Sequence, residues 1–335
     1  MMEMKYRLWA CLLFLPMVLW ASGRPKVAVV LSGGGAKGTA HIGALKVIEE
    51  AGIPIDYVVG TSMGAIVGGL YSIGYTPQQL DSMVNAQNWK FLLSDAPNPK
   101  DVLLDDRLKS ERYVLSIPFS LKSAAVSDAG IIKGKNLARL FSTLTEGYQD
   151  SVDFSRLPIP FACVSENLVN GSEVVFHEGI LATAMRSSMS IPGVFAPVDL
   201  DGMVLVDGGM VNNYPVDVAL AMGADYIIGV DVQSPLLKAS ELKSVKDIFG
   251  QIINLQGEKK YRENLRNTDV LIKVDVTGYS AASFTKEAID TLMVRGRACC
   301  HGQLGRTACP ETEAGTCRRL SASPPGTFPL ARRGC

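Results

Sequence analysis

Histidine is scarce in this chain, and neither sign of charge is in excess. The 335 residues include only 3 histidines, and 33 basic side chains balance 33 acidic ones. A balanced charge offers no general attraction for a polyanion, so no nucleic-acid partner is expected. Hydrophobic residues make up 47% of the chain, which excludes a disordered protein and suffices for a large buried core.

Cysteine is nearly absent from the body of the chain, where only Cys11 and Cys163 occur before residue 299. This scarcity excludes a disulfide framework for the body. The segment 297–335 differs, because it is rich in cysteine and lacks lysine and apolar periodicity. We predict that it is an atypical tail, either disordered or non-native. Its cysteines and His301 could bind a metal, but their spacing matches no zinc-finger pattern.

The first 23 residues have the pattern of a secretory signal peptide. Lys5 and Arg7 precede an apolar run from Leu8 to Trp20, and Ala21-Ser22-Gly23 offers small residues for cleavage. The run is short for a bilayer span, although a short membrane anchor is the alternative interpretation. We therefore expect an exported protein whose folded domain covers residues 24–296.

Apolar runs alternate with helical patterns in the first part of this domain. Val27–Leu31 and Tyr57–Val59 are continuous apolar runs typical of buried parallel strands, and helices are predicted over 38–51 and 64–73. This order favours an α/β fold with a parallel sheet and right-handed crossovers. Later strands are predicted over 160–164, 173–176, 203–206, 226–230 and 270–273. Later helices are predicted over 134–143, 180–187, 215–222 and 245–266.

A Gly-x-Ser-x-Gly pattern follows the second predicted strand, as Gly60-Thr-Ser62-Met-Gly64. It is the pattern of a nucleophile elbow, in which a serine occupies a tight strand-to-helix turn and its hydroxyl is exposed. Glycines flank such a serine because a side chain would clash within the turn or block the substrate. Ser62 is therefore the candidate nucleophile.

A glycine-rich loop, Gly33-Gly-Gly-Ala-Lys-Gly38, follows the first predicted strand and opens a helix. Because parallel strands end at one edge of a sheet, this loop and Ser62 should face the same crevice. Its backbone N–H groups predict an anion site that can serve as an oxyanion hole, with Lys37 either adding charge or solvated. The loop also matches a dinucleotide fingerprint, but Asp56 lies at the wrong end of the second strand to hold a ribose.

A serine nucleophile needs a proton acceptor, which is most often a histidine. His41 lies within the first predicted helix and His177 follows a strand, and no motif surrounds either, so we interpret both as structural. Asp207-Gly208-Gly209 follows the apolar strand 203–206. In a partly desolvated crevice Asp207 could accept the proton directly, although Asp-Gly alone also fits a hairpin turn.

The three motifs, in this order, resemble the patatin-like phospholipase family. The segments 187–195 and 212–216 also look like connecting segments of that family, and the resemblance covers about residues 26–275. It implies a three-layer α/β sandwich with a central, mainly parallel sheet. It also implies a Ser–Asp dyad, with Ser62 as nucleophile and Asp207 as proton acceptor.

The resemblance assigns further residues to the site. The backbone of Gly33, Gly34 and Gly35 would form the oxyanion hole. The supporting motif residues would be Lys37, Gly38, Gly60, Gly64, Gly208 and Gly209.

The implied reaction is hydrolysis of an acyl ester in a lipid or phospholipid, at a membrane surface, through an acyl-serine intermediate and without a metal or cofactor. An acyltransferase that uses the same site and a non-catalytic lipid-binding module are the alternatives. Exported bacterial proteins of this kind often continue into a periplasmic module and an outer-membrane barrel. We therefore expect a truncated relative of such a protein, located in the periplasm, the outer membrane or at the cell surface of a bacterium.

Overall fold

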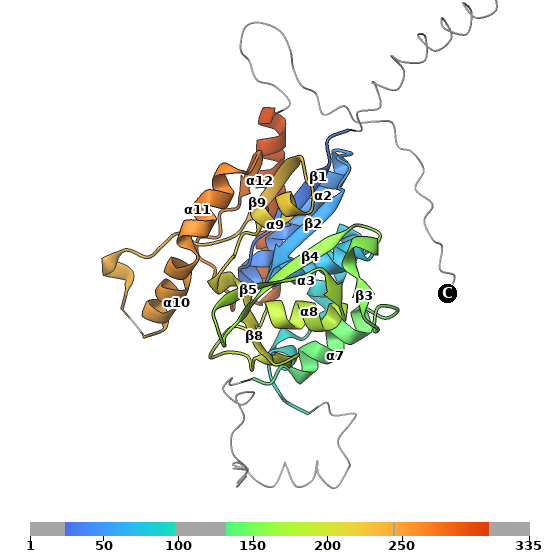
Figure 1. Cartoon of the computed structure of the whole chain (residues 1–335). Coiled ribbons are helices and arrows are strands. Elements are labelled where there is room, and N and C mark those ends of the chain that lie inside the picture. Colours follow the sequence, from blue (N-terminus) through green and yellow to red (C-terminus); the bar gives the residue numbers. More distant parts are fainter. Residues whose placement is uncertain (1–23, 98–131, 244, 308–335) are drawn as a thin grey trace, which may run out of the picture.

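The computed structural model describes residues 24–97, 132–243 and 245–307. The predicted signal peptide and residues 308–335 of the predicted tail lie outside the described residues. The described chain builds an 8-stranded sheet in the order β10-β9-β1-β2-β4-β8-β7, with β5 paired to β4 (Figure 1). Strands β10, β9, β1, β2 and β4 are parallel to one another, so the predicted α/β fold with a mainly parallel sheet is confirmed.

The bounds of the strands follow the predicted apolar runs. The sheet consists of β1 (Val27–Leu31), β2 (Tyr57–Thr61), β4 (Phe161–Asn167), β5 (Ser172–Phe176), β7 (Val198–Leu200), β8 (Met203–Asp207), β9 (Tyr226–Asp231) and β10 (Val270–Lys273). The short strands β3 (Val152–Asp153) and β6 (Glu178–Gly179) form a separate antiparallel pair.

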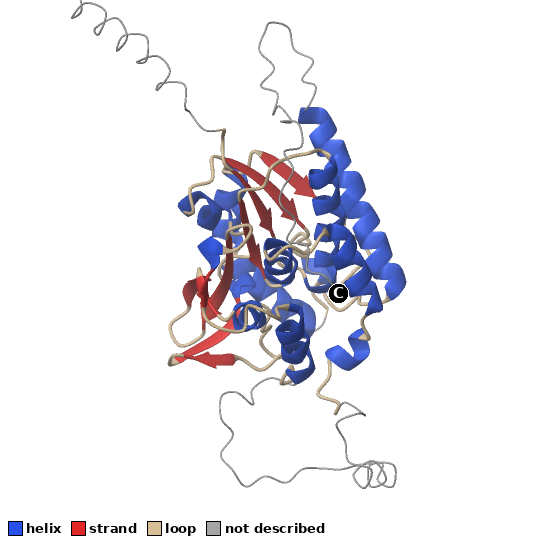
Figure 2. Cartoon of the chain, turned by 90° about the vertical axis from the view of Figure 1, so that its right-hand side faces the viewer, coloured by secondary structure: helices blue, strands red, loops and turns tan. Residues whose placement is uncertain are grey.

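Helices cover both faces of the sheet (Figure 2). Val27, Val29 and Leu31 of β1 point into one hydrophobic core, and Ala28 and Val30 point into a second core on the other face. The first core packs against α2 (Ala40–Glu50), α3 (Met63–Ser72), α4 (Pro77–Ala86), α7 (Lys135–Leu144), α8 (Leu181–Ser188) and α12 (Lys286–Thr307). The second core packs against α9 (Val216–Ala221) and α11 (Glu258–Arg266). This arrangement is the predicted three-layer sandwich.

Two helical regions differ from the prediction. The single helix expected over 245–266 is interrupted at Gly257, which separates α10 (Val245–Gln256) from α11. Helix α4 was not predicted, although its start carries a capping box: the Gln79 N–H donates to Thr76 Oγ1 at 3.2 Å, and the Thr76 N–H donates to Gln79 Oε1 at 2.9 Å. No helix within the described ranges is long and apolar enough to cross a bilayer.

Helix α12 crosses the domain boundary that we predicted at residue 296. It packs along α2, and Cys300 within it is fully buried. The two helices approach closely at Gly296, where an added Cβ would collide with the carbonyl oxygen of Ala40. The predicted boundary is therefore wrong, because residues 297–307 continue a helix that belongs to the folded domain.

Candidate active site

The ends of β2 and β8 meet on one edge of β4. Thr61, the last residue of β2, pairs with Val164 of β4, and Asp207, the last residue of β8, pairs with the next residue, Ser165. The other edge of β4 is occupied by β5 over residues 163–167, so β2 and β8 share the remaining edge end to end. This register places Ser62, which follows Thr61, next to Asp207.

Ser62 has the backbone conformation of a nucleophile elbow. Its φ of 55° and ψ of −120° are unusual for a residue with a side chain, and the residue forms the N-cap of α3. Such a conformation costs on the order of 1–3 kcal/mol and persists only where the surrounding structure enforces it. An added Cβ at Gly60 would collide with the carbonyl oxygen of Gly64, and one at Gly64 would collide with that of Leu31. Both predicted glycines thus allow the tight turn.

The Ser62 hydroxyl donates a hydrogen bond of 2.7 Å to Oδ2 of Asp207. The other carboxylate oxygen of Asp207 accepts the Gly209 N–H at 2.7 Å. Gly208 lets this turn lie against β4, since an added Cβ would strike the Val164 carbonyl. The two motifs therefore converge as predicted, although β8 reaches the site as a strand antiparallel to β4 rather than as a parallel one.

Burial prepares Asp207 to accept a proton. The residue is 6% exposed, and this desolvation raises the pKa of its carboxyl to about 6, against the opposing hydrogen bonds from Ser62 and Gly209. A general base is most effective when its pKa lies near the working pH. A carboxylate with this pKa is ionised at neutral pH and is more basic than an exposed aspartate.

The glycine-rich loop lies beside Ser62, because an added Cβ at Gly33 would approach the Ser62 Cβ to 3.1 Å. The Gly33 N–H already donates to the carbonyl oxygen of Asn213 at 3.1 Å, so Gly33 does not provide the free donor that the sequence assigned to it. No hydrogen bond is recorded for the N–H groups of Gly34 and Gly35 within the described residues. Gly35 has a φ of 56° at the start of the 3-10 turn η1 (Gly35–Thr39), a conformation that favours glycine.

Lys37 is neither solvated nor free. The residue is 9% exposed, and its Nζ donates to Ser234 Oγ at 2.9 Å. Burial lowers the pKa of Lys37 to about 8, and the nearby charge of Lys273 also lowers it. Gly38, one residue on, admits the side chain of Met63, which an added Cβ would contact.

Comparison with known proteins identifies the family of this chain. The family model for patatin-like phospholipase matches residues 29–220, which include Ser62 and Asp207. The chain belongs to the patatin-like phospholipase family.

Several relatives of this patatin-like protein are known. An NTE family protein of Mycobacterium tuberculosis is 32% identical over 211 residues, which is 63% of this chain and 50% of that protein. Patatin-like phospholipase domain-containing protein 6 of Homo sapiens is 32% identical over 62% of this chain and 13% of its own length. Lysophospholipase NTE1 of Mycosarcoma maydis is 29% identical over 71% of this chain and 12% of its own length. The chain thus spans about half the length of the mycobacterial relative and less of the others.

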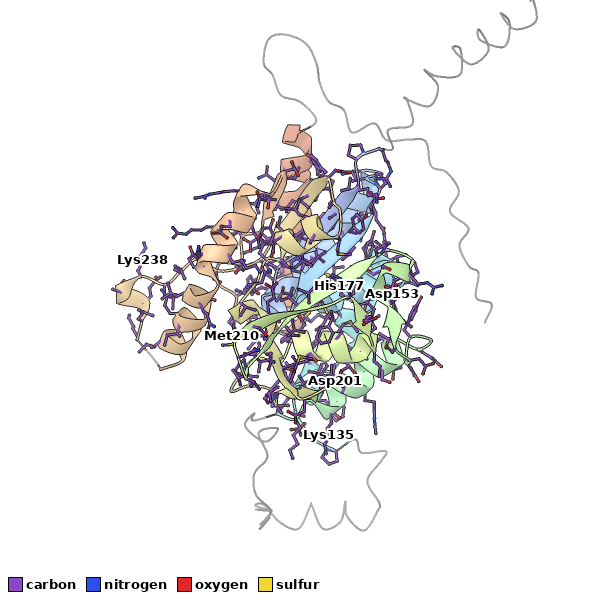
Figure 3. All side chains as sticks on the ribbon, viewed as in Figure 1. Lys135, Asp153, His177, Asp201, Met210 and Lys238 are labelled. Carbon is purple, nitrogen blue, oxygen red and sulfur yellow. The ribbon has the colours of Figure 1, made fainter. Side chains whose placement is uncertain are left out.

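Three histidines lie in the described ranges, and His301 of α12 lies 4.0 Å from Glu50 rather than at the dyad. His41 is fully buried, and its Nε2 contacts the Ser32 carbonyl oxygen at 2.8 Å; burial lowers its pKa to about 4. His177 follows β5, which runs antiparallel to β4, so the chain there leads away from the Ser62 end. It lies near Asp153 in the region of β3 and β6 (Figure 3).

Two serines that the motifs do not include, Ser188 and Ser190, position the dyad. Ser188 Oγ accepts the Ser62 N–H at 2.9 Å. The buried guanidinium of Arg186 donates to Ser190 Oγ at 2.5 Å and to the Ala196 carbonyl at 3.1 Å, while the Ser190 carbonyl accepts the Asp207 N–H at 3.0 Å. The sequence had one signal for them, the segment 187–195, which resembles a connecting segment of the family.

An apolar cavity of about 40 Å³ lies among the helices that cover the first core. Met63, the residue after Ser62, forms part of its wall, and Trp89 and Phe284 stack at another part with ring centroids 4.5 Å apart. Most of the remaining lining comes from aliphatic side chains of α3, α4 and α7. Within the described ranges, no group of three or more His, Cys, Asp or Glu residues is placed to hold a metal ion.

Proposed function

We propose that this protein hydrolyses acyl esters of phospholipids or lysophospholipids with Ser62 as nucleophile and Asp207 as proton acceptor. The observation that carries the proposal is the 2.7 Å hydrogen bond between the Ser62 hydroxyl and the buried Asp207 carboxylate, at a serine with a strained backbone. Membership of the patatin-like phospholipase family supports a lipid ester hydrolase. The name of the related lysophospholipase supports lysophospholipids as substrates.

The Ser62 hydroxyl and the Asp207 carboxylate can carry out all the proton transfers of the reaction. As Ser62 Oγ attacks the ester carbonyl carbon, its proton passes to Asp207 Oδ2, and the developing oxyanion accepts hydrogen bonds from the backbone N–H groups of Gly34 and Gly35. Collapse of this intermediate breaks the ester C–O bond, and Asp207 returns the proton to the leaving alcohol. Water then attacks the acyl-serine, gives a proton to Asp207 and releases the fatty acid, after which the proton returns to Ser62.

The apolar cavity supports a lipid rather than a polar ester as substrate. An acyl chain that reacts at Ser62 needs an apolar wall within reach of the ester, and Met63 and Met189 provide part of one. Burial of each methylene group of such a chain contributes about 0.8 kcal/mol.

Labelling with a fluorophosphonate probe tests the proposal on the full chain. We expect the wild-type protein and Ser82→Ala, which alters an exposed serine of α4, to be labelled equally, whereas Ser62→Ala is not labelled. Release of fatty acid from lysophosphatidylcholine should follow the same pattern. A folded wild-type protein that neither takes up the probe nor releases fatty acid would refute the proposed hydrolase.

A further inference from the structure

A second, larger cavity of about 330 Å³ lies beside the dyad, between the ends of β9 and β10 and the helices α10 and α11. Its wall shares two residues with the active site. Gly209 donates its N–H to Asp207, and the Asn213 carbonyl accepts the N–H of Gly33. Met210, the next residue, lies on the side of the molecule that carries α10 (Figure 3). Unlike the cavity at Met63, this one has polar groups in its lining, among them Gln233, Ser234, Asn254 and Lys273.

Lys273 presents a cation to this second cavity. Its Nζ contacts Asp231 Oδ2 at 2.5 Å and the Tyr261 hydroxyl at 3.3 Å, and its side chain is 41% exposed while that of Asp231 is 0% exposed. An ammonium group has three N–H donors. The two contacts recorded within the described residues therefore leave one donor for a ligand in the cavity.

The charged side chains in and behind the cavity wall carry more positive than negative charge. Lys37 lies behind the wall, where its Nζ donates to Ser234 Oγ, so two lysines stand near the single buried carboxylate of Asp231. The acidic residue in the lining, Glu258, is paired with Arg262 at 2.7 Å. At the same wall, Gln233 Nε2 is a buried donor for which the described part of the chain offers no acceptor. An anion in the cavity would meet cations and donors rather than an uncompensated acidic group.

We propose that this cavity binds the phosphodiester of a phospholipid headgroup, and that Lys273 is the residue that favours phosphate-bearing lipids over neutral ones. The proposal rests on the proposed hydrolase activity, because the ester must lie at Ser62 with its acyl chain toward Met63 and its headgroup toward Gly209. The apolar cavity adjoins the serine elbow through Met63, and the second cavity adjoins the Asp-Gly-Gly turn through Gly209.

Kinetics with two substrates test this assignment. Lysophosphatidylcholine and a monoacylglycerol with the same acyl chain, each in non-ionic detergent micelles, differ in the phosphate-bearing headgroup. We expect Lys273→Gln to raise KM for lysophosphatidylcholine about tenfold and to leave monoacylglycerol turnover within twofold. Lys259→Gln, which removes the same charge from an exposed position outside the cavity lining, should change neither. Equal effects of Lys273→Gln on both substrates in a folded protein would overturn the proposal.

A second variant keeps the test decisive if Lys273→Gln fails to fold after losing its bond to Asp231. Asn254 lines the cavity from the exposed side of α10 and does not touch Asp231. Asn254→Trp should fill the cavity and produce the same selective rise in KM for the phosphate-bearing substrate. Unchanged kinetics, or equal losses on both substrates, would contradict a headgroup site.

Binding measurements separate this proposal from the proposed activity and from a site for free phosphate. In calorimetric titrations of the inactive Ser62→Ala protein, glycerophosphocholine should bind, and Ser62→Ala combined with Lys273→Gln should bind at least tenfold more weakly. This result would support the headgroup site even if the wild-type protein hydrolysed neither lipid. Tighter binding of inorganic phosphate than of glycerophosphocholine, without discrimination between the two lipid substrates, would replace the headgroup site by a free-phosphate site.

Discussion

The Ser188 hydroxyl connects the strained nucleophile to the central sheet: it accepts the Ser62 N–H at 2.9 Å and donates to the Val164 carbonyl at 2.5 Å. Val164 is the residue of β4 at which β2 ends. The Ser188 side chain thus anchors the backbone of Ser62 to β4, at the point where the pairing of β4 with β2 ends and its pairing with β8 begins.

Removal of this hydroxyl should affect both stability and catalysis. We expect Ser188→Ala to lower the free energy of unfolding by about 1–3 kcal/mol, because the buried Ser62 N–H loses its acceptor. Turnover should fall about tenfold because the nucleophile becomes less well positioned. Urea unfolding measures the change in stability, and ester hydrolysis measures the change in turnover. The neighbouring Ser187→Ala is the control, since Ser187 Oγ donates to the Thr183 carbonyl of its own helix. Equal turnover of the two variants would contradict this positioning by Ser188.

The backbone strain at Ser62 predicts a difference between two inactive variants. Ser62→Ala and Ser62→Gly should both lose turnover by at least about 10⁴-fold, since each lacks the nucleophile. Ser62→Gly should nevertheless unfold with a free energy about 1 kcal/mol higher than Ser62→Ala, because glycine adopts a φ of 55° without steric cost. Thermal and urea unfolding of the pair measure this difference. If alanine proved the more stable, the turn would not be strained as we describe.

The raised pKa of Asp207 predicts opposite pH dependences for activity and stability. Because the carboxylate must be ionised to accept a proton, kcat/KM should rise with pH up to about 6 and then level off. Its folded-state pKa lies above the ordinary value of 3.8, so its contribution to stability is complete below about pH 4 and is lost as the pH rises through 6. Asp207→Asn should abolish activity and remove this part of the stability profile.

The control for Asp207→Asn is Asp201→Asn, at an exposed turn between β7 and β8 (Figure 3). It should keep both pH profiles of the wild-type protein. A wild-type pH–rate profile that is flat between pH 5 and 7 would argue against Asp207 as the proton acceptor.

His41 should matter for stability and little for chemistry. His41→Leu leaves the buried Ser32 carbonyl without its donor and should cost about 1–3 kcal/mol of unfolding free energy, whereas His41→Gln can retain a donor and should cost less. Turnover per folded molecule should stay within a few-fold in both variants. Loss of turnover in a folded His41→Gln protein would instead indicate a histidine in the catalytic machinery.

The depressed pKa of His41 gives this residue a part in acid unfolding. The pKa falls from 6.5 to about 4 on burial, so the stability contributed by the neutral ring is present above pH 6.5 and is lost as the pH falls through 4. Urea unfolding of wild-type and His41→Gln protein between pH 4 and 7 measures this contribution. The free-energy difference between the two proteins should shrink toward low pH.

Much of the parallel sheet could be predicted from local sequence. β1 and β10 have the predicted bounds. β1 is apolar at every position because it is covered on both faces, whereas β10 lies at the edge of the sheet and ends in the exposed Lys273. Helix α12 could not be predicted in this way. Its large buried apolar residues, Ile289, Leu292 and Met293, lie in its first half, whereas its later part packs through Gly296 and the small Cys300, so the helix as a whole shows little helical periodicity.

The motifs also predicted which side chains converge, and the 2.7 Å contact between Ser62 and Asp207 agrees with them. They could not predict how the two meet, because that depends on the register of β4 with strands that lie far away along the chain. Nor could they reveal that the Gly33 N–H is occupied, since its partner is a backbone carbonyl at Asn213 that any residue could supply.

The packing of α12 on α2 has a consequence for the order of events during synthesis. β1 lies between β2 and β9, and α2, which follows β1, is covered by a helix that ends at Thr307. While the chain emerges from the ribosome, the apolar side of α2 stays open until the last described helix has been made. We therefore expect the domain to finish folding only after translation has passed residue 300.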